Sequence, residues 1–290
     1  MPGRSLDQKS LALVASLRSM GRLLVAYSGG TDSAYLAYEA HRVLGREMLA
    51  VIADSPSLSR AHLQDAVQFA EESDIPFRVI QTQELDNPDY IKNDGTRCFH
   101  CKDELFQRMD ELCDRLGFTR IAYGMNLDDI GEFRPGQMAA RKHSVVAPLA
   151  EAELTKQEIR QLAQQAGLRI WDKPASACLS SRVAYGEPVV RETLRTIERG
   201  EEILAGMGYR QFRVRHHGDM VRLEISREEM ARVFSLDEVD RIAADLKALG
   251  YKYVTLDLEG YRSGSMNAVL SISEIRRATA GPAKGPESSS

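Results

Sequence analysis

The segment with the clearest chemical signature follows the apolar run Leu23–Tyr27 and precedes a helical pattern over Ala34–Val43. It consists of six residues: Ser28, Gly29, Gly30, Thr31, Asp32 and Ser33. Two glycines let the backbone turn sharply near a ligand, and the unpaired amides at a helix start attract an anion. The three hydroxyl side chains add hydrogen-bond donors. The pattern therefore predicts a loop that binds phosphate groups, called the phosphate loop below.

Asp32 places a carboxylate inside this loop. A carboxylate beside phosphates is repelled unless a divalent cation bridges the two, so the loop implies Mg²⁺. The string matches neither Gly-x-x-x-x-Gly-Lys-Ser/Thr nor Gly-x-Gly-x-x-Gly. The structural alternative is an ordinary turn between a strand and a helix. A complete six-residue string at a strand end favours the phosphate loop over that alternative.

Cys98 and Cys101 form a Cys-x-x-Cys pair that we expect in a polar loop before a helix over Lys102–Leu116, and Cys178 lies far along the chain. Such a pair serves as a redox dithiol, half a zinc site or part of an iron–sulfur site, and the spacing alone leaves these open. Three thiolates with one open iron position suit a cluster that presents a sulfur atom. Cys113 falls on the apolar stripe of the helix, so we expect it in the core.

The elements that position these groups alternate between short apolar strands and amphipathic helices from Arg22 to about Asp172. This alternation indicates an α/β fold with a parallel sheet covered by helices, in which ligands bind at the carboxyl ends of the strands. The expected strands are Leu23–Tyr27, Met48–Ala53, Phe77–Ile80 and Arg120–Tyr123. Three polar residues follow the last of these strands: Asn126, Asp128 and Asp129. They either bind the metal or the substrate, or form a simple polar loop.

The pattern changes after Arg182 to that of a smaller α+β domain, with expected helices over residues 189–207 and 236–249 and a last strand over 251–258. Between them, two alternating runs around a glycine-containing turn predict a hairpin. Alternation sends the apolar side chains to one face and a charged set to the other: Arg213, Arg215, Arg222 and Glu224. Several guanidiniums on one face can bind a phosphate by forked hydrogen bonds, and a solvated sheet face is the alternative.

Composition sets the context for these sites. The chain has 290 residues, 43% of them hydrophobic and 28% charged, enough for a sizeable core and two domains. A net charge of -4 argues against a broad nucleic-acid surface and favours a small-molecule partner. We find no export signal and no apolar run of roughly 20 residues, so we expect a cytoplasmic protein with reduced thiols and no membrane segment.

The phosphate loop resembles the PP-loop of ATP pyrophosphatases, enzymes that cleave ATP to AMP and pyrophosphate. Over nearly its whole length the chain also resembles the LarE sulfur transferases, which make the nickel-pincer nucleotide cofactor of lactate racemase. Five segments carry this resemblance: Val25–Gly30, Glu132–Gly136, Ala177–Gly186, Val214–His217, and Tyr253–Asp257 with Gly260–Gly264. The expected fold is accordingly a PP-loop domain with a smaller C-terminal α+β domain.

The resemblance implies that ATP adenylates a carboxylate of pyridinium-3,5-biscarboxylic acid mononucleotide, after which a sulfur nucleophile displaces AMP and leaves a thiocarboxylate. One branch of the family sacrifices a cysteine at the position of Cys178, and another binds a [4Fe-4S] cluster through three cysteines and transfers an added sulfide. Cys98 and Cys101 accompany Cys178 here, so the chain resembles the cluster branch. The substrate nucleotide is expected to contact a polar set: Ser181, Arg182, Arg213, Arg215 and Arg262.

We expect three segments: a PP-loop domain over residues 1–182, a domain for substrate binding and oligomerisation over 183–278, and a disordered tail over 279–290. The expected partners are the nucleotide substrate, a sulfide donor and further copies of the chain. Competing hypotheses are a PP-loop tRNA thiolase, an ammonia-using synthetase that needs no cysteine, and a non-catalytic nucleotide sensor. Added RNA-binding modules, typical of the thiolase, are not visible in the sequence.

Overall fold

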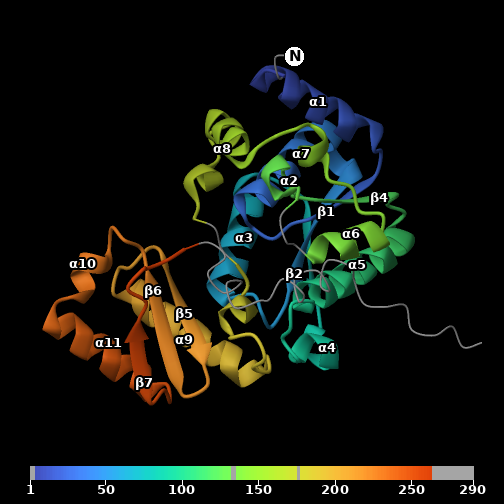
Figure 1. Ribbon diagram of the computed structural model, residues 1–290. Helices are drawn as coiled ribbons and strands as arrows, with labels where there is room; N and C mark the ends of the chain where they lie inside the picture. Colours follow the sequence, from blue (N-terminus) through green and yellow to red (C-terminus); the bar gives the residue numbers. More distant parts are fainter. Residues whose placement is uncertain (1–3, 132–134, 175–176, 263–290) are drawn as a thin grey trace, which may run out of the picture. The chain divides into compact units, whose positions relative to one another are not determined.

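The computed structural model describes residues 4–131, 135–174 and 177–262 (Figure 1). The chain divides into two compact units. Unit 1 comprises Met1–Gln83 and Cys98–Ser176, and unit 2 comprises Glu84–Arg97 and Ala177–Ser290. Unit 2 therefore takes a short segment from within the first half of the sequence. The expected boundaries at residues 182 and 278 stay predictions, and the tail over 279–290 lies outside the described residues.

Unit 1 contains a parallel sheet with the strand order β3-β2-β1-β4, which confirms the expected α/β architecture. In register, Leu23 of the central strand lies opposite Met48 on one side and Arg120 on the other. All four strands fall where the sequence predicts them, with ends that differ by at most a residue: β1 Leu23–Ala26, β2 Met48–Asp54, β3 Phe77–Gln81 and β4 Arg120–Tyr123.

Strand β1 is buried on both faces, as expected for the centre of a parallel sheet. Leu23 and Val25 belong to one apolar cluster, whereas Leu24 and Ala26 belong to a second cluster on the opposite face. Helices α1, α2, α3 and α8 contribute to the first cluster, and α5 and α6 to the second. The helices of this region are α1 Leu6–Ser19, α2 Thr31–Leu44, α3 Arg60–Glu72, α5 Arg97–Leu116, α6 Gly136–Lys142, α7 Pro148–Glu151 and α8 Lys156–Gln165.

The strand order reverses between β1 and β4, because β2 and β3 lie on one side of β1 and β4 on the other. Ligands of open α/β sheets bind at the carboxyl ends of the strands at such a switch point. The phosphate loop leaves β1 at this point. Gly124 follows β4 there, and a Cβ atom on it would lie 2.7 Å from the Ser33 amide nitrogen. Glycine at 124 thus allows the start of α2 to approach the end of β4.

Unit 2 contains the expected hairpin and a third strand, in the order β5-β6-β7. Strands β5 and β6 are antiparallel, with Arg213 opposite Glu224 and Val214 opposite Leu223, so the predicted division into charged and apolar faces is confirmed. Strand β7 pairs parallel to β6 and is shorter than predicted. The elements are α4 Pro88–Ile91, α9 Arg191–Gly206, β5 Phe212–His217, β6 Met220–Ile225, α10 Met230–Val233, α11 Leu236–Ala248 and β7 Tyr253–Leu256.

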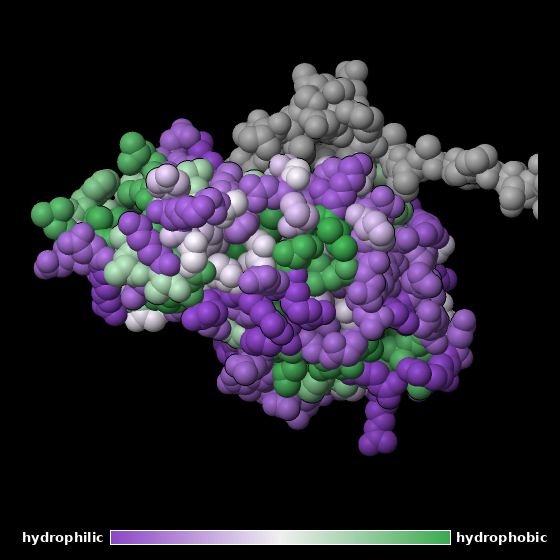
Figure 2. All heavy atoms as spheres, turned by 90° about the horizontal axis from the view of Figure 1, so that it is seen from below, coloured by the Kyte–Doolittle hydropathy of each residue, from purple (hydrophilic) through white to green (hydrophobic). Residues whose placement is uncertain are grey.

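The surface shown in Figure 2 is largely hydrophilic, with small hydrophobic patches between polar side chains. Within the ranges that the structure describes, none of the helices is both long and apolar enough to cross a lipid bilayer.

Candidate active site

The phosphate loop turns at Gly29, whose φ of +74° lies in the left-handed region that glycine adopts without strain. A Cβ atom at this position would lie 2.7 Å from the Cβ of Ala66 in α3, so the close approach of that helix also requires glycine. Gly30 precedes α2 in extended conformation and no side chain caps the helix there. The first amides of α2 are therefore left to bind an anion at the end of β1.

The loop hydroxyls also hold the loop in shape. The Ser33 hydroxyl donates to the Gly30 carbonyl at 3.1 Å and lies 3.1 Å from the Ser28 hydroxyl. Thr31 is buried, and its hydroxyl donates to the Ile170 carbonyl at 3.0 Å. Thr31 thereby ties the loop to the segment that follows α8, and its expected donation to a phosphate stays a prediction.

Asp32 has one oxygen engaged and one available. Its Oδ2 accepts hydrogen bonds from Lys156 Nζ at 2.5 Å and from Asn126 Nδ2 at 3.4 Å. Its Oδ1 is buried and has no hydrogen-bond partner in the described parts of the chain. A buried carboxylate oxygen without a donor is the kind of ligand that Mg²⁺ binds, so this one oxygen fits the expected cation.

Two further side chains hold the loop carbonyls. Lys173 donates to the Gly29 carbonyl at 2.8 Å and also pairs with Asp65, and His62 Nε2 donates to the Ser28 carbonyl at 2.9 Å. Burial alone would raise the pKa of Asp65, but hydrogen bonds from Lys173 and Arg169 hold it below its ordinary value. No local motif marks His62, Lys156 or Lys173 as site residues, and only the fold brings them to the loop.

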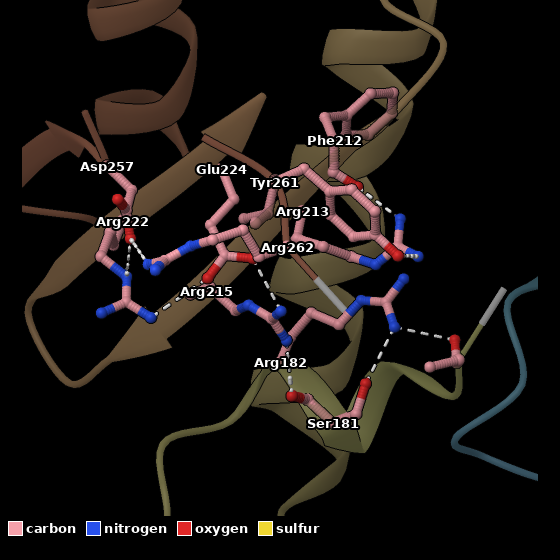
Figure 3. Close-up of polar contacts among 12 residues, drawn as sticks. Ser181, Arg182, Phe212, Arg213, Arg215, Arg222, Glu224, Asp257, Tyr261 and Arg262 are labelled. Atoms are coloured by element: carbon pink, nitrogen blue, oxygen red, sulfur yellow. Dashed lines mark hydrogen bonds and ion pairs between the residues drawn. The ribbon is translucent and has the colours of Figure 1, made fainter. Parts of the chain in front are cut away.

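Unit 2 gathers the predicted arginines beside carboxylates (Figure 3). We call five residues the arginine cluster: Arg182, Arg213, Arg215, Arg222 and Arg262. Arg215 forms an ion pair of 2.7 Å with Glu224, and both side chains are buried. Arg182 pairs with Glu201 of α9 at 2.8 Å and is also buried. These guanidiniums are built into the fold and do not form a solvated face.

The other three members of the arginine cluster, Arg213, Arg222 and Arg262, are less buried than Arg182 and Arg215. Arg213 lies over the ring of Tyr261, 4.7 Å from its centroid. Burial, followed by the charge of Arg182, lowers the pKa of Arg213, so an anion placed here would stabilise its charged form. Arg222 approaches Glu224 at 3.2 Å and Asp257 at 3.8 Å. Arg262 contacts two carboxylates, Glu259 at 2.6 Å and Asp257 at 3.9 Å.

The cysteine pair lies in a helix and not in the predicted loop. Helix α5 begins at Arg97, so Cys98 and Cys101 are the second and fifth residues of the helix. Their separation of three residues puts both on one side of the helix, with Cys98 exposed and Cys101 partly buried. The loop prediction was wrong because the polar residues before Lys102 suggested a later helix start than the structure has.

Cys178 is partly buried in unit 2, directly before a short 3₁₀ turn, η5, over Leu179–Arg182. Its carbonyl accepts hydrogen bonds from the Ser181 hydroxyl at 2.7 Å and from Arg182 Nη1 at 3.1 Å. Cys113 was expected in the core and is partly buried against an apolar cluster, and burial raises its pKa to about 11. Three thiols other than Cys113 are thus present as donors, which fits the chemistry of a thiolate-bound iron–sulfur cluster.

Cys98 and Cys101 belong to unit 1 and Cys178 to unit 2. Within either unit, the described residues include no group of three or more His, Cys, Asp or Glu side chains that could hold a metal ion. Two segments of the predicted family motifs, Glu132–Arg134 and Ser263–Gly264, lie outside the described residues.

Comparison with known proteins gave no match to a family model. Three curated proteins match most of the chain. The pyridinium-3,5-bisthiocarboxylic acid mononucleotide synthase of Lactiplantibacillus plantarum is 33% identical over 275 residues, covering 93% of this chain and 98% of the synthase. An uncharacterised protein of Synechocystis is 41% identical over 87% of the chain and 94% of its own length. An uncharacterised protein of Methanocaldococcus jannaschii is 28% identical over 83% of the chain and 91% of its own length.

The parallel sheet, the loop after β1 and this similarity define an enzyme of the PP-loop sulfurtransferase type. More particularly, the chain belongs to the LarE family, since it matches the synthase over nearly the full length of both proteins.

Proposed function

We propose that this enzyme uses ATP to convert a carboxylate of pyridinium-3,5-biscarboxylic acid mononucleotide into a thiocarboxylate. The observation that carries the proposal is the match to the L. plantarum synthase, which covers 93% of this chain and is named for the bisthiocarboxylic product. The phosphate loop at the switch point of the sheet and the arginine cluster of unit 2 supply the two kinds of anion site that the reaction needs.

In the first step, a carboxylate oxygen of the substrate attacks the α-phosphorus of ATP, and pyrophosphate leaves. The amides at the start of α2 would bind the phosphates, and Lys156 and Lys173 would offset their charge. Asp32 would use its Oδ1 to hold the Mg²⁺ that accompanies ATP, because its Oδ2 already accepts from Lys156. The product is an acyl adenylate, in which AMP is a better leaving group than the original carboxylate oxygen.

The arginine cluster would bind the anionic groups of the mononucleotide. Arg213 supports this role because it is partly buried and the charge of Arg182 acts on it, so that a bound phosphate would relieve the repulsion between two guanidiniums. Ser181 accepts from Arg182 Nη1 at 2.9 Å and would add a polar contact. Arg215 and Arg262 would complete the set predicted from the sequence.

In the second step, a sulfur nucleophile attacks the acyl carbon, and AMP leaves with the electron pair of the broken C–O bond. We propose that Cys98, Cys101 and Cys178 provide thiolate ligands for a [4Fe-4S] cluster. Such a cluster, when bound, would carry an added sulfide on its fourth iron. The exposed position of Cys98 and its place beside Cys101 on one helical turn support this assignment over a structural role.

The proposal is tested with anaerobically purified protein, ATP, Mg²⁺, sulfide and the biscarboxylic mononucleotide. We expect pyrophosphate release that depends on the mononucleotide, and a product whose mass reflects exchange of oxygen for sulfur. Pyrophosphate release with ammonia as acceptor and an amide product would refute the proposal in favour of a synthetase. Substrate-dependent turnover with bulk tRNA in place of the mononucleotide would refute it in favour of a thiolase.

The sulfur source is tested by replacing Cys98, Cys101 and Cys178 singly with serine, with Cys113→Ser as the matched control. If the thiolates hold a cluster, each single replacement removes the brown chromophore, the iron and sulfur transfer together, whereas the control keeps all three. A sacrificial Cys178 would instead give one turnover, convert that residue to dehydroalanine by mass spectrometry and tolerate changes at Cys98 and Cys101. Iron-free protein that completes one transfer would overturn the cluster assignment.

A further inference from the structure

A segment of unit 2 that precedes the cysteine pair contains a group of buried polar side chains. Tyr90 is 1% exposed, Asn93 is 0% exposed and Arg97 is 5% exposed. Buried polar groups need hydrogen-bond partners, and an arginine is rarely buried to this extent. The hydrogen-bond partners of these three residues therefore indicate which part of the chain the segment holds in place.

The partners lie in the chain that follows Cys178. The Tyr90 hydroxyl is 2.5 Å from the Ser180 hydroxyl, and Arg97 Nη1 donates to the Ser180 carbonyl at 2.8 Å. Asn93 Nδ2 donates to the carbonyls of Ala184 and Glu187, each at 2.8 Å. Arg97 also donates to the Asn93 side-chain oxygen, which joins the contacts into one network.

This network holds both the side chain and the carbonyl of Ser180, a residue that is itself fully buried. Ser180 lies within the turn η5, which begins one residue after Cys178. Within the same turn, the side chains of Ser181 and Arg182 donate to the Cys178 carbonyl. Two sets of hydrogen bonds thus hold the backbone from Cys178 to Ser180, while Cys178 itself is partly exposed.

Arg97 is also the sequence neighbour of Cys98. A single peptide bond links Arg97 to Cys98, the first cysteine of the pair, and the Arg97 side chain donates to the Ser180 carbonyl in the turn after Cys178. Neighbouring Cα atoms are about 3.8 Å apart across a trans peptide bond. Displacement of Arg97 would therefore remove a contact that holds the turn after Cys178.

We infer that Tyr90, Asn93 and Arg97 form a clamp that positions the Cys178 thiol for sulfur transfer. This inference rests on the proposed function, in which Cys178 is either a cluster ligand or a sulfur donor. The clamp residues are positioning residues, since they act through the backbone of Ser180 and do not touch the reacting atoms. Small displacements of a reacting group can lower a rate by about 100-fold, which makes such positioning measurable.

The test uses Tyr90→Phe and Arg97→Lys in the full chain, with Tyr209→Phe as the matched control. Tyr209 is equally buried in unit 2, and its hydroxyl donates to Glu238, outside the clamp. Three quantities are measured: the alkylation rate of Cys178 in iron-free protein, resolved by peptide mass spectrometry; kcat and KM for sulfur transfer; and ATP binding.

We expect both clamp variants to change the Cys178 alkylation rate by about fivefold or more and to lower kcat by about tenfold, with ATP binding unchanged. Tyr209→Phe should match the wild type in all three. Adding Ser180→Ala to Tyr90→Phe should cause little further change, because the hydroxyl contact is already lost. This non-additivity distinguishes the contact itself from a general loss of stability.

The clamp is overturned if Tyr90→Phe and Arg97→Lys resemble Tyr209→Phe in both the alkylation rate and kcat. Failure of the proposed function gives a different result, because wild-type protein would then transfer no sulfur at all. In that case the alkylation rates alone decide whether the clamp positions the thiol. Equal rates for the wild type and both clamp variants would reject it.

Discussion

The buried ion pair between Arg215 and Glu224 leads to a quantitative prediction about Arg215→Ala. The two side chains are 6% and 0% exposed and their charged atoms are 2.7 Å apart. Removing one partner of a buried pair costs about 3–5 kcal/mol, because the other charge stays buried. Arg222 would still lie 3.2 Å from Glu224, so we expect the lower end of this range. A loss of about 3 kcal/mol corresponds to roughly a 100-fold fall in the ratio of folded to unfolded protein.

Urea unfolding measures this loss as a lower midpoint with an unchanged slope. Lys252→Ala is the control, since Lys252 and Asp219 also pair at 2.7 Å but are 68% and 63% exposed. Exposed pairs contribute about 0–1 kcal/mol. The double variant Arg215→Met with Glu224→Gln should recover much of the stability, because it removes both charges of the buried pair while Arg222 keeps Asp257 at 3.8 Å. The reasoning is refuted if Arg215→Ala loses no more stability than Lys252→Ala.

Three further predictions concern the other sites. Asp32→Ala should abolish Mg²⁺-dependent pyrophosphate release while the protein still folds and unfolds cooperatively in urea, and undiminished turnover would contradict the role of Asp32. Arg213→Ala should weaken mononucleotide binding by about 10–100-fold through loss of a charge-assisted hydrogen bond, while calorimetry shows unchanged ATP affinity. Equal loss of both ligands would point to misfolding. Since burial raises the pKa of Cys113 to about 11, its alkylation should be slow at pH 8 and rise about tenfold per pH unit until that value. A rate that levels off near pH 8 would show an unburied thiol.

The fold was predictable where local pattern and packing agree. The four predicted runs became the four strands of unit 1, and the signal is clearest at β1, which is buried on both faces and therefore needs a continuous hydrophobic segment. The hairpin register followed from strict alternation, which puts Val214 and Leu223 on one face and Arg213 and Glu224 on the other. Both features depend on residues that are close in sequence.

The site was only partly predictable, since its contacts come from distant segments. Lys156 is 124 residues from Asp32, and Lys173 is 144 residues from Gly29, so neither pair has a local signal. Alternation predicted that Arg215 and Glu224 share a face, but their complete burial depends on how the surrounding elements pack. The start of α5 was missed because hydrophobic periodicity marks the helix body more clearly than its first turn.

The segment Glu84–Arg97 is synthesised well before the residues it binds. Arg97 and its partner Ser180 are separated by 83 positions. At about 5–20 residues per second, the ribosome would need about 4–17 s to add them. During that interval Tyr90, Asn93 and Arg97 cannot yet form their hydrogen bonds to Ser180, Ala184 and Glu187, although the four strands of the parallel sheet are already complete by Tyr123. Unit 2 therefore cannot complete its fold from the residues after Cys178 alone, because it also needs Glu84–Arg97. This early segment must neither misfold nor aggregate until the chain beyond Cys178 leaves the exit tunnel of the ribosome.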